Sequence, residues 1–195
     1  MIDCLNAARY FIVKAYEDGR EAEMTNMKVQ KLLYYSQSIH LALYDEPLFD
    51  DPIQAWRYGP VCPRAYRFYN EFEANQLPLP NKEFLYEIPD SAINLLEEVW
   101  GYFGTYHAYM LSDMTHVEFP WKKARKNLAP QESSTESISV EDMQVLGSQK
   151  LEAIERANPA YEATISQVLN NALSSQLRAR VGKGEAGDWL KSLLD

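Results

Sequence analysis

The sequence predicts a mainly α-helical protein: a compact multi-helix domain with a short extended arm or hairpin around residues 47–63, followed by a helical C-terminal extension. Apolar residues recur every three to four positions along most of the chain, the spacing typical of helices with one buried face. Several of these segments begin at a helix-capping residue and end near glycine or proline. The apolar–polar alternation typical of strands is confined to one short stretch.

The two N-terminal segments carry the clearest helical signals. Asp3 is well placed to cap a helix over residues 3–17. Thr25 is the expected cap of a second helix, which Asp45 and Pro47 end. The apolar face of this second helix is too broad for a surface helix, so we expect it at the centre of the bundle.

The stretch 47–63 differs in kind because it is rich in proline. We expect an extended arm with a turn at Tyr58-Gly59-Pro60, since glycine permits unusual φ values and proline fixes its own. A short hairpin fits this pattern, whereas a large sheet does not. Trp56 and Tyr58 either pack inward or form an exposed anchor, and inward packing is the preferred interpretation.

The C-terminal half predicts further helices. One starts after Pro63, and another is capped by Asp90 and ends at Gly104. Shorter helices are expected over residues 105–114 and 119–127.

Residues 131–139 are polar and lack apolar periodicity, so they are interpreted as a flexible boundary. Helical patterns resume over 140–158 and 161–180. The expected organisation is a domain over residues 1–157 and a helical extension over residues 158–195.

The charge balance restricts the classes of partner. The chain has 28 acidic and 19 basic side chains and a net charge of −9, which disfavours nucleic acid and anionic membranes. A basic run at Lys122, Lys123, Arg125 and Lys126 is interpreted as a solvated face or helix-end charge. DNA binding is therefore disfavoured.

A cytoplasmic location without membrane attachment is expected. The N-terminus does not resemble a secretory signal, and no stretch approaches the roughly 20 apolar residues of a membrane span. Cys4 and Cys62 form neither a CxxC pair nor a metal-ligand spacing, which suits a reducing compartment. Neither a metal nor another cofactor is expected.

The histidines raise one catalytic alternative. His116 lies near Ser112 and Thr115, so a small hydrolase or transferase using this imidazole with either hydroxyl remains an open hypothesis. The simpler interpretation is that Thr115 and His116 bind the local main chain near a helix end. A metal site built from His40, His107 and His116 would need three distant segments to converge, and it is not expected.

Several sequence blocks together resemble one known family. The blocks are Met24–His40, Pro47–Asp50 with Ile53–Val61, and Leu111–His116 with Pro120–Arg125. In this order they resemble the Panacea domain of the SocA-like antitoxins, a family that includes phage-associated proteins similar to GepA. The resemblance extends over roughly residues 3–157.

The resemblance implies an antitoxin that binds and neutralises a cognate protein toxin encoded beside it. One member of the family resembles an adaptor that delivers its toxin to the ClpXP protease, so a protease of this type is a second implied partner. The family brings no agreed catalytic set, and the protein is therefore not expected to be an enzyme.

The residues matching the family motifs are expected to form its framework. They are Lys31, Tyr35, His40, Gly59, Pro60, Thr115 and His116. Partner binding is expected at aromatic and arginine side chains, which commonly dominate interface energy. The candidates are Trp56, Arg57, Tyr58, Arg64, Tyr66, Trp121 and Trp189.

Overall fold

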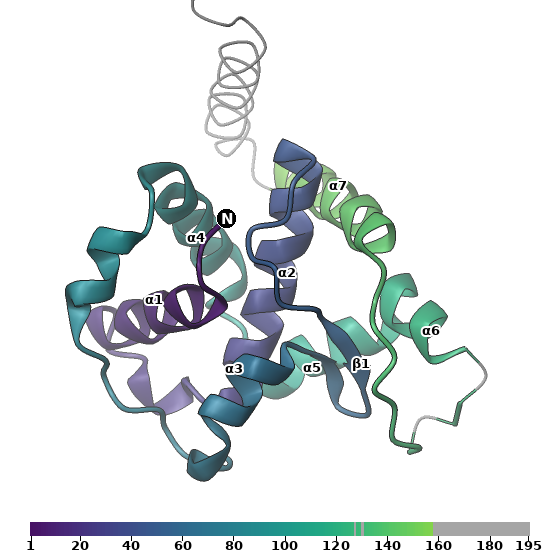
Figure 1. Cartoon of the computed structure of the whole chain (residues 1–195), viewed down its shortest axis with the longest axis horizontal. Helices are drawn as coiled ribbons and strands as arrows, with labels where there is room; N and C mark the ends of the chain where they lie inside the picture. The colour runs from purple at the N-terminus through teal and green to yellow at the C-terminus, as the bar shows by residue number, and fades with distance from the viewer. Residues whose placement is uncertain (127, 130, 158–195) are drawn as a thin grey trace, which may run out of the picture. The chain divides into compact units, whose positions relative to one another are not determined.

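The computed structural model describes residues 1–126, 128–129 and 131–157. The chain divides into two compact units, 1–150 and 151–195. The first unit has the mainly helical fold that the sequence predicts (Figure 1). The expected extension over residues 158–195, including Trp189, lies outside the described residues, and a domain boundary at residue 157 stays a prediction.

Helix α2 (Asn26–Tyr44) is the central helix of the first unit, as its broad apolar face predicts (Figure 1). It packs against α1 (Cys4–Glu17), α4 (Asp90–Phe103) and α5 (Ala108–Val117). The ring of Tyr35, fully buried on α2, stacks on Phe103 with 4.0 Å between ring centroids. Such large buried rings supply much of the apolar burial that stabilises the bundle.

The helix ends follow local capping chemistry. Asp3 caps α1, and its Oδ1 accepts a hydrogen bond from the amide of Leu5 at 2.8 Å. Thr25 caps α2 through the amide of Lys28 at 3.4 Å. Both caps are as predicted. The expected cap of α4 is wrong by one residue, because Pro89 holds the N-cap position and Asp90 is the first helical residue.

The arm forms an antiparallel hairpin of β1 (Gln54–Trp56) and β2 (Gly59–Val61). The expected turn at Tyr58-Gly59-Pro60 is misplaced, because Arg57 and Tyr58 make the turn and Pro60 lies in β2 opposite Ala55. Pro60 has no amide hydrogen to donate to β1. None is needed at this pair, because Ala55 directs its own amide away from β2 and donates to Glu136 O at 2.8 Å.

Residues 131–139 are not the flexible boundary that their polar composition predicts. This segment runs along β1, where Gln54 pairs with Ser137 and the amide of Ile138 donates to Ile53 O at 2.8 Å. Ile138 is buried. The segment satisfies main-chain groups at an otherwise open strand edge, a tertiary requirement that composition does not record.

The remaining elements of the described residues are three 3₁₀ helices and three further α-helices. They are the 3₁₀ helices η1 (Glu21–Glu23), η2 (Asn70–Phe72) and η3 (Lys82–Glu87), with α3 (Pro63–Phe68), α6 (Phe119–Arg125) and α7 (Val140–Ala157). Helix α5 begins at Ala108, three residues later than expected, because His107 caps it. Within the described residues, no helix has both the length and the apolar character required to cross a bilayer.

The first part of α7, up to Lys150, packs on α2. At the closest approach, a Cβ atom added to Gly147 would lie 1.9 Å from the carbonyl oxygen of Ser38. Nearby, the carboxylate of Glu118 accepts hydrogen bonds from Tyr35 Oη at 3.0 Å and Lys150 Nζ at 2.6 Å. Burial raises the pKa of Glu118, and the nearby ammonium of Lys150 opposes this shift.

Replacing Gly147 with alanine tests this approach. Alanine favours an isolated helix by roughly 1 kcal/mol over glycine. Here the added methyl group must push α7 away from the backbone of Ser38, an overpacking that costs about 1–3 kcal/mol. We expect Gly147→Ala to lower the free energy of unfolding measured by urea denaturation. Ser148→Ala, the next position and exposed, should change it by less than about 0.5 kcal/mol; equal effects would contradict the packing argument.

Candidate partner-binding groove

Successive carbonyl oxygens of the hairpin are held by side chains from α2, α5 and α6. The pairs are Ala55 O with Arg125 Nη1 (3.3 Å), Trp56 O with Trp121 Nε1 (2.8 Å), Arg57 O with His116 Nε2 (3.1 Å), Tyr58 O with Ser112 Oγ (3.1 Å) and Pro60 O with Lys31 Nζ (3.1 Å). A two-stranded hairpin is marginally stable alone in water. These hydrogen bonds therefore fix its position on the helical bundle.

Lys31 connects α2 to the second strand of the hairpin. Its side chain is 1% exposed, and its ammonium donates to the carbonyl of Pro60. Burial lowers the pKa of Lys31 to about 7, because the charged form loses its hydration. The amine therefore titrates near neutral pH while it lies against the hairpin.

Gly59 allows this close approach. Its φ of +99° is strained for any residue with a side chain. A Cβ atom at this position would also lie 2.7 Å from Thr115 Oγ1 and 2.8 Å from Lys31 Nζ. Both the backbone conformation and the space therefore require glycine, which explains the Gly-Pro pair in the motif.

The imidazole of His116 has a structural role in this arrangement. Its Nε2 donates to Arg57 O, and its ring lies 4.6 Å from the ring of Trp121. The hydroxyl of Ser112 donates to Tyr58 O, and that of Thr115 donates to Ser112 O at 2.8 Å. Both hydroxyl protons are thus directed at the main chain, so the geometry does not support a nucleophile activated by His116.

The other motif residues also support the framework. Tyr35 is buried between Phe103 and Glu118. Nδ1 of His40 donates to Glu46 O at 2.7 Å and so ties the segment that follows α2 to the end of this helix. These contacts give Tyr35 and His40 structural roles.

Arg125 belongs to the basic run, and its interpretation as a solvated charge is wrong. It is buried, and its guanidinium donates to Ala55 O, to Ala129 O at 2.9 Å and to Glu132 O at 2.6 Å. The guanidinium also lies over the ring of Trp121, 4.8 Å from its centroid. The spacing of Trp121 and Arg125 by one helical turn was the available signal, since such residues share a face.

The basic run therefore does not form one exposed face. Arg125 is buried, Lys123 pairs with Asp142 at 2.8 Å, and Lys126 lies 3.9 Å from Glu136. These interactions leave less unpaired positive charge than the sequence alone shows.

A groove of about 890 Å³ opens beside the hairpin, and we call it the hairpin groove. Its walls come from η1 and the start of α2, from the hairpin and α3, and from residues 70–74, 107–109 and 133–135. Lys31 lines it, together with the aromatic side chains of Trp56, Tyr58 and Tyr66. The rings of Trp56 and Tyr66 are 4.9 Å apart, and Tyr58 is 60% exposed.

The expected partner-binding residues divide into separate groups. Trp56, Arg57, Tyr58 and Tyr66 meet at the hairpin groove. Trp121, which is 7% exposed and donates to Trp56 O, does not line this groove. It lines a second pocket of about 440 Å³ together with Arg57 and Tyr58.

Arg64 forms ion pairs in a different part of the structure. Its guanidinium pairs with Asp3 at 2.8 Å and with Asp51 at 3.3 Å. It does not line the hairpin groove, so the structure separates it from the aromatic candidates. Trp189, as stated above, lies outside the described residues.

The fold and the groove define a small helical domain whose motif side chains hold a hairpin at the rim of an apolar depression. Residues 29–122 match the model of the family described as antitoxin SocA-like, Panacea domain. This match agrees with the resemblance to the SocA-like Panacea family that the sequence blocks show. No curated protein and no solved structure matches the chain significantly.

The buried lysine predicts a distinctive pH dependence of stability. The pKa of Lys31 falls from 10.5 to about 7 on folding, so between these values the unfolded chain binds more protons than the folded one. Stability therefore rises with pH in this window, by up to about 1.4 kcal/mol per pH unit from this group. We expect Lys31→Met to remove that rise.

Chemical denaturation of both proteins from pH 7 toward 10.5 measures this effect. The stability of wild type relative to Lys31→Met should increase with pH. Lys122→Met, which changes an exposed lysine, should follow the wild-type curve. Parallel curves for wild type and Lys31→Met would show that Lys31 is not buried as described.

Proposed function

We propose that this protein is the antitoxin of a toxin–antitoxin pair and that it neutralises a cognate protein toxin through the hairpin groove. The proposal rests on one observation: partly exposed aromatic side chains lie on and beside a hairpin whose main chain is held in place by hydrogen bonds. Tyr58 and Tyr66 line the groove and are 60% and 36% exposed. The carbonyl oxygens of Ala55 and Pro60 accept hydrogen bonds from Arg125 and Lys31.

This arrangement suits protein binding on energetic grounds. Aromatic anchors lose little conformational entropy when they are buried at an interface, particularly on a backbone that is already ordered. The family match supports an antitoxin as the class of protein. The net charge of −9 favours a basic toxin, since opposite fields speed association.

Two modes of neutralisation are compatible with this surface. In the first, the antitoxin covers the active site of the toxin. In the second, it also delivers the toxin to a ClpXP-type protease, acting in the cytoplasm. Direct inhibition is the simpler mode, because the groove supplies a binding surface without a second partner.

Co-expression with the protein encoded by the neighbouring gene tests the proposal. Expression of the neighbour alone should arrest growth, and co-expression with this chain should relieve the arrest. Unchanged toxicity would exclude this pair. Relief that disappears in cells lacking the protease, together with a rise in toxin level, would identify delivery rather than direct inhibition.

The groove aromatics should dominate this interaction. We expect Tyr58→Ala and Tyr66→Ala each to weaken toxin binding by about 1–3 kcal/mol, roughly 5- to 150-fold, because both remove a partly exposed anchor. Calorimetric titration of the purified pair measures the affinities. Tyr86→Ala is the matched control, since Tyr86 is 93% exposed and lies outside the groove.

The unfolding midpoints of these variants should stay close to that of wild type, because neither anchor is buried in the core. Binding that is equally strong in all three tyrosine variants would place the interface elsewhere. A defect confined to Tyr86→Ala would have the same meaning.

A further inference from the structure

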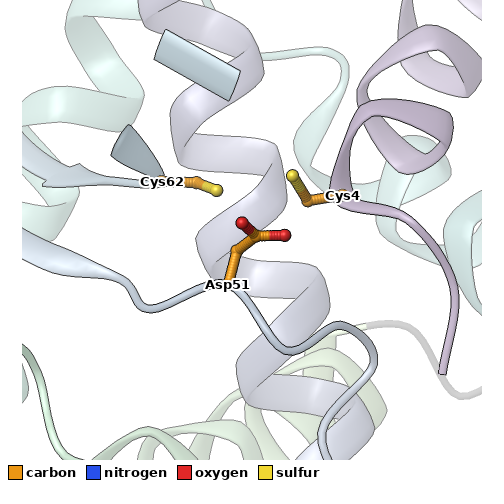
Figure 2. A group of neighbouring side chains, drawn as sticks. All are labelled: Cys4, Asp51 and Cys62. Carbon is orange, nitrogen blue, oxygen red and sulfur yellow. The ribbon is translucent and has the colours of Figure 1, made fainter. Parts of the chain in front are cut away.

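Two thiols and a carboxylate from separate parts of the chain lie close together near the end of the hairpin that is opposite its turn. Cys4 is the first residue of α1, Asp51 follows α2, and Cys62 precedes α3. Figure 2 shows the two sulfur atoms and the carboxylate turned toward the same space. One ligand atom from each residue lies within 4.8 Å of the other two.

This spacing fits a tetrahedral metal ion. With Zn–S bonds of about 2.3 Å, two thiolates on one zinc ion are about 3.8 Å apart. The observed separations of up to 4.8 Å need only small side-chain rotations to reach that geometry. A disulfide, by contrast, requires sulfur atoms about 2.05 Å apart.

The ligand positions are held by other contacts. The amide of Cys62 donates to the buried Gln30 Oε1 at 2.9 Å. The Asp3 cap fixes the start of α1, which carries Cys4. Both thiols are fully buried, whereas the side chain of Asp51 is 19% exposed and leaves a path for an ion from solvent.

Arg64 supplies positive charge beside this cluster. Its Nη1 lies 3.3 Å from Asp51 Oδ2, which leaves the other carboxylate oxygen for a metal. The same nitrogen is 3.9 Å from Cys4 Sγ. Two thiolates and the Asp51 carboxylate carry three negative charges, and a divalent ion together with this guanidinium, which also pairs with Asp3, offsets most of the negative charge. Hydrogen bonding of a ligating carboxylate to a second residue is typical of protein metal sites.

We propose that Cys4, Asp51 and Cys62 bind a zinc ion, with a water molecule as the fourth ligand. Thiolates select zinc over magnesium and calcium, which prefer sets of oxygen ligands. Binding releases one proton from each thiol to solvent. The ion joins the start of α1 to both chain segments that flank β1 and β2, so it acts as a structural staple behind the hairpin.

The test uses the full-length protein, reduced with a phosphine and stripped of metal with a chelator. Titration with Zn²⁺ alone, against a competing chromogenic chelator, should show one ion bound per chain. Titration with Co²⁺ should produce sulfur-to-cobalt charge-transfer absorption. Zn²⁺ should also raise the unfolding temperature, because a ligand that binds the native state stabilises it.

Variants assign the ligands. The double variant Cys4→Ser, Cys62→Ser should lose more than about 100-fold in zinc affinity, since loss of a second-shell partner alone typically costs about 10- to 100-fold. Asp51→Asn should lose about tenfold or more. Asp50→Asn is the matched control, because it removes the adjacent but exposed carboxylate.

The proposal is overturned if reduced wild type binds Zn²⁺ no more tightly than the double serine variant, or if Co²⁺ gives no sulfur charge-transfer absorption. Circular dichroism establishes whether the serine variant is folded. If it is not, the comparison of Asp51→Asn with Asp50→Asn decides the matter, and equal affinities in that pair reject the site.

Discussion

The hydrogen bonds from helix side chains to the carbonyl oxygens of the hairpin are the constraint on which the rest of this structure depends. A hairpin this short cannot pair all of its main-chain groups, and unpaired carbonyls at a packed interface are costly. Lys31 and His116 supply two of the missing donors from different helices. The helices must therefore keep a fixed arrangement for the hairpin to keep its shape.

This constraint separates two kinds of residue in the motif region. Side chains such as His116 and Trp121 donate hydrogen bonds to the main chain of the hairpin, so their chemistry is set by the fold. Tyr58 and Tyr66 belong to the same region but face the groove. A domain with this division can keep its framework while the residues that line the groove change.

The sequence predicts what is determined locally. The caps at Asp3 and Thr25 depend on neighbouring residues, so both were correct. The turn was misplaced by one residue, because Gly59 pairs with Trp56 at the start of β2, where its close approach to Thr115 depends on contacts distant in sequence. The strand-like course of residues 131–139 and the meeting of Cys4 with Cys62 depend on contacts distant in sequence, which neither composition nor spacing records.

The pairing of residues 136–138 with β1 also has a consequence for synthesis of the chain. The edge of β1 stays unpaired until these residues have left the ribosome, because Glu136 and Ile138 form its second border. Contacts of such long sequence separation slow folding and leave the nascent strand open to other chains. The hairpin groove therefore forms only after nearly the whole first unit has been translated, and a product truncated before these residues would carry the tyrosines without the strand edge that completes the hairpin.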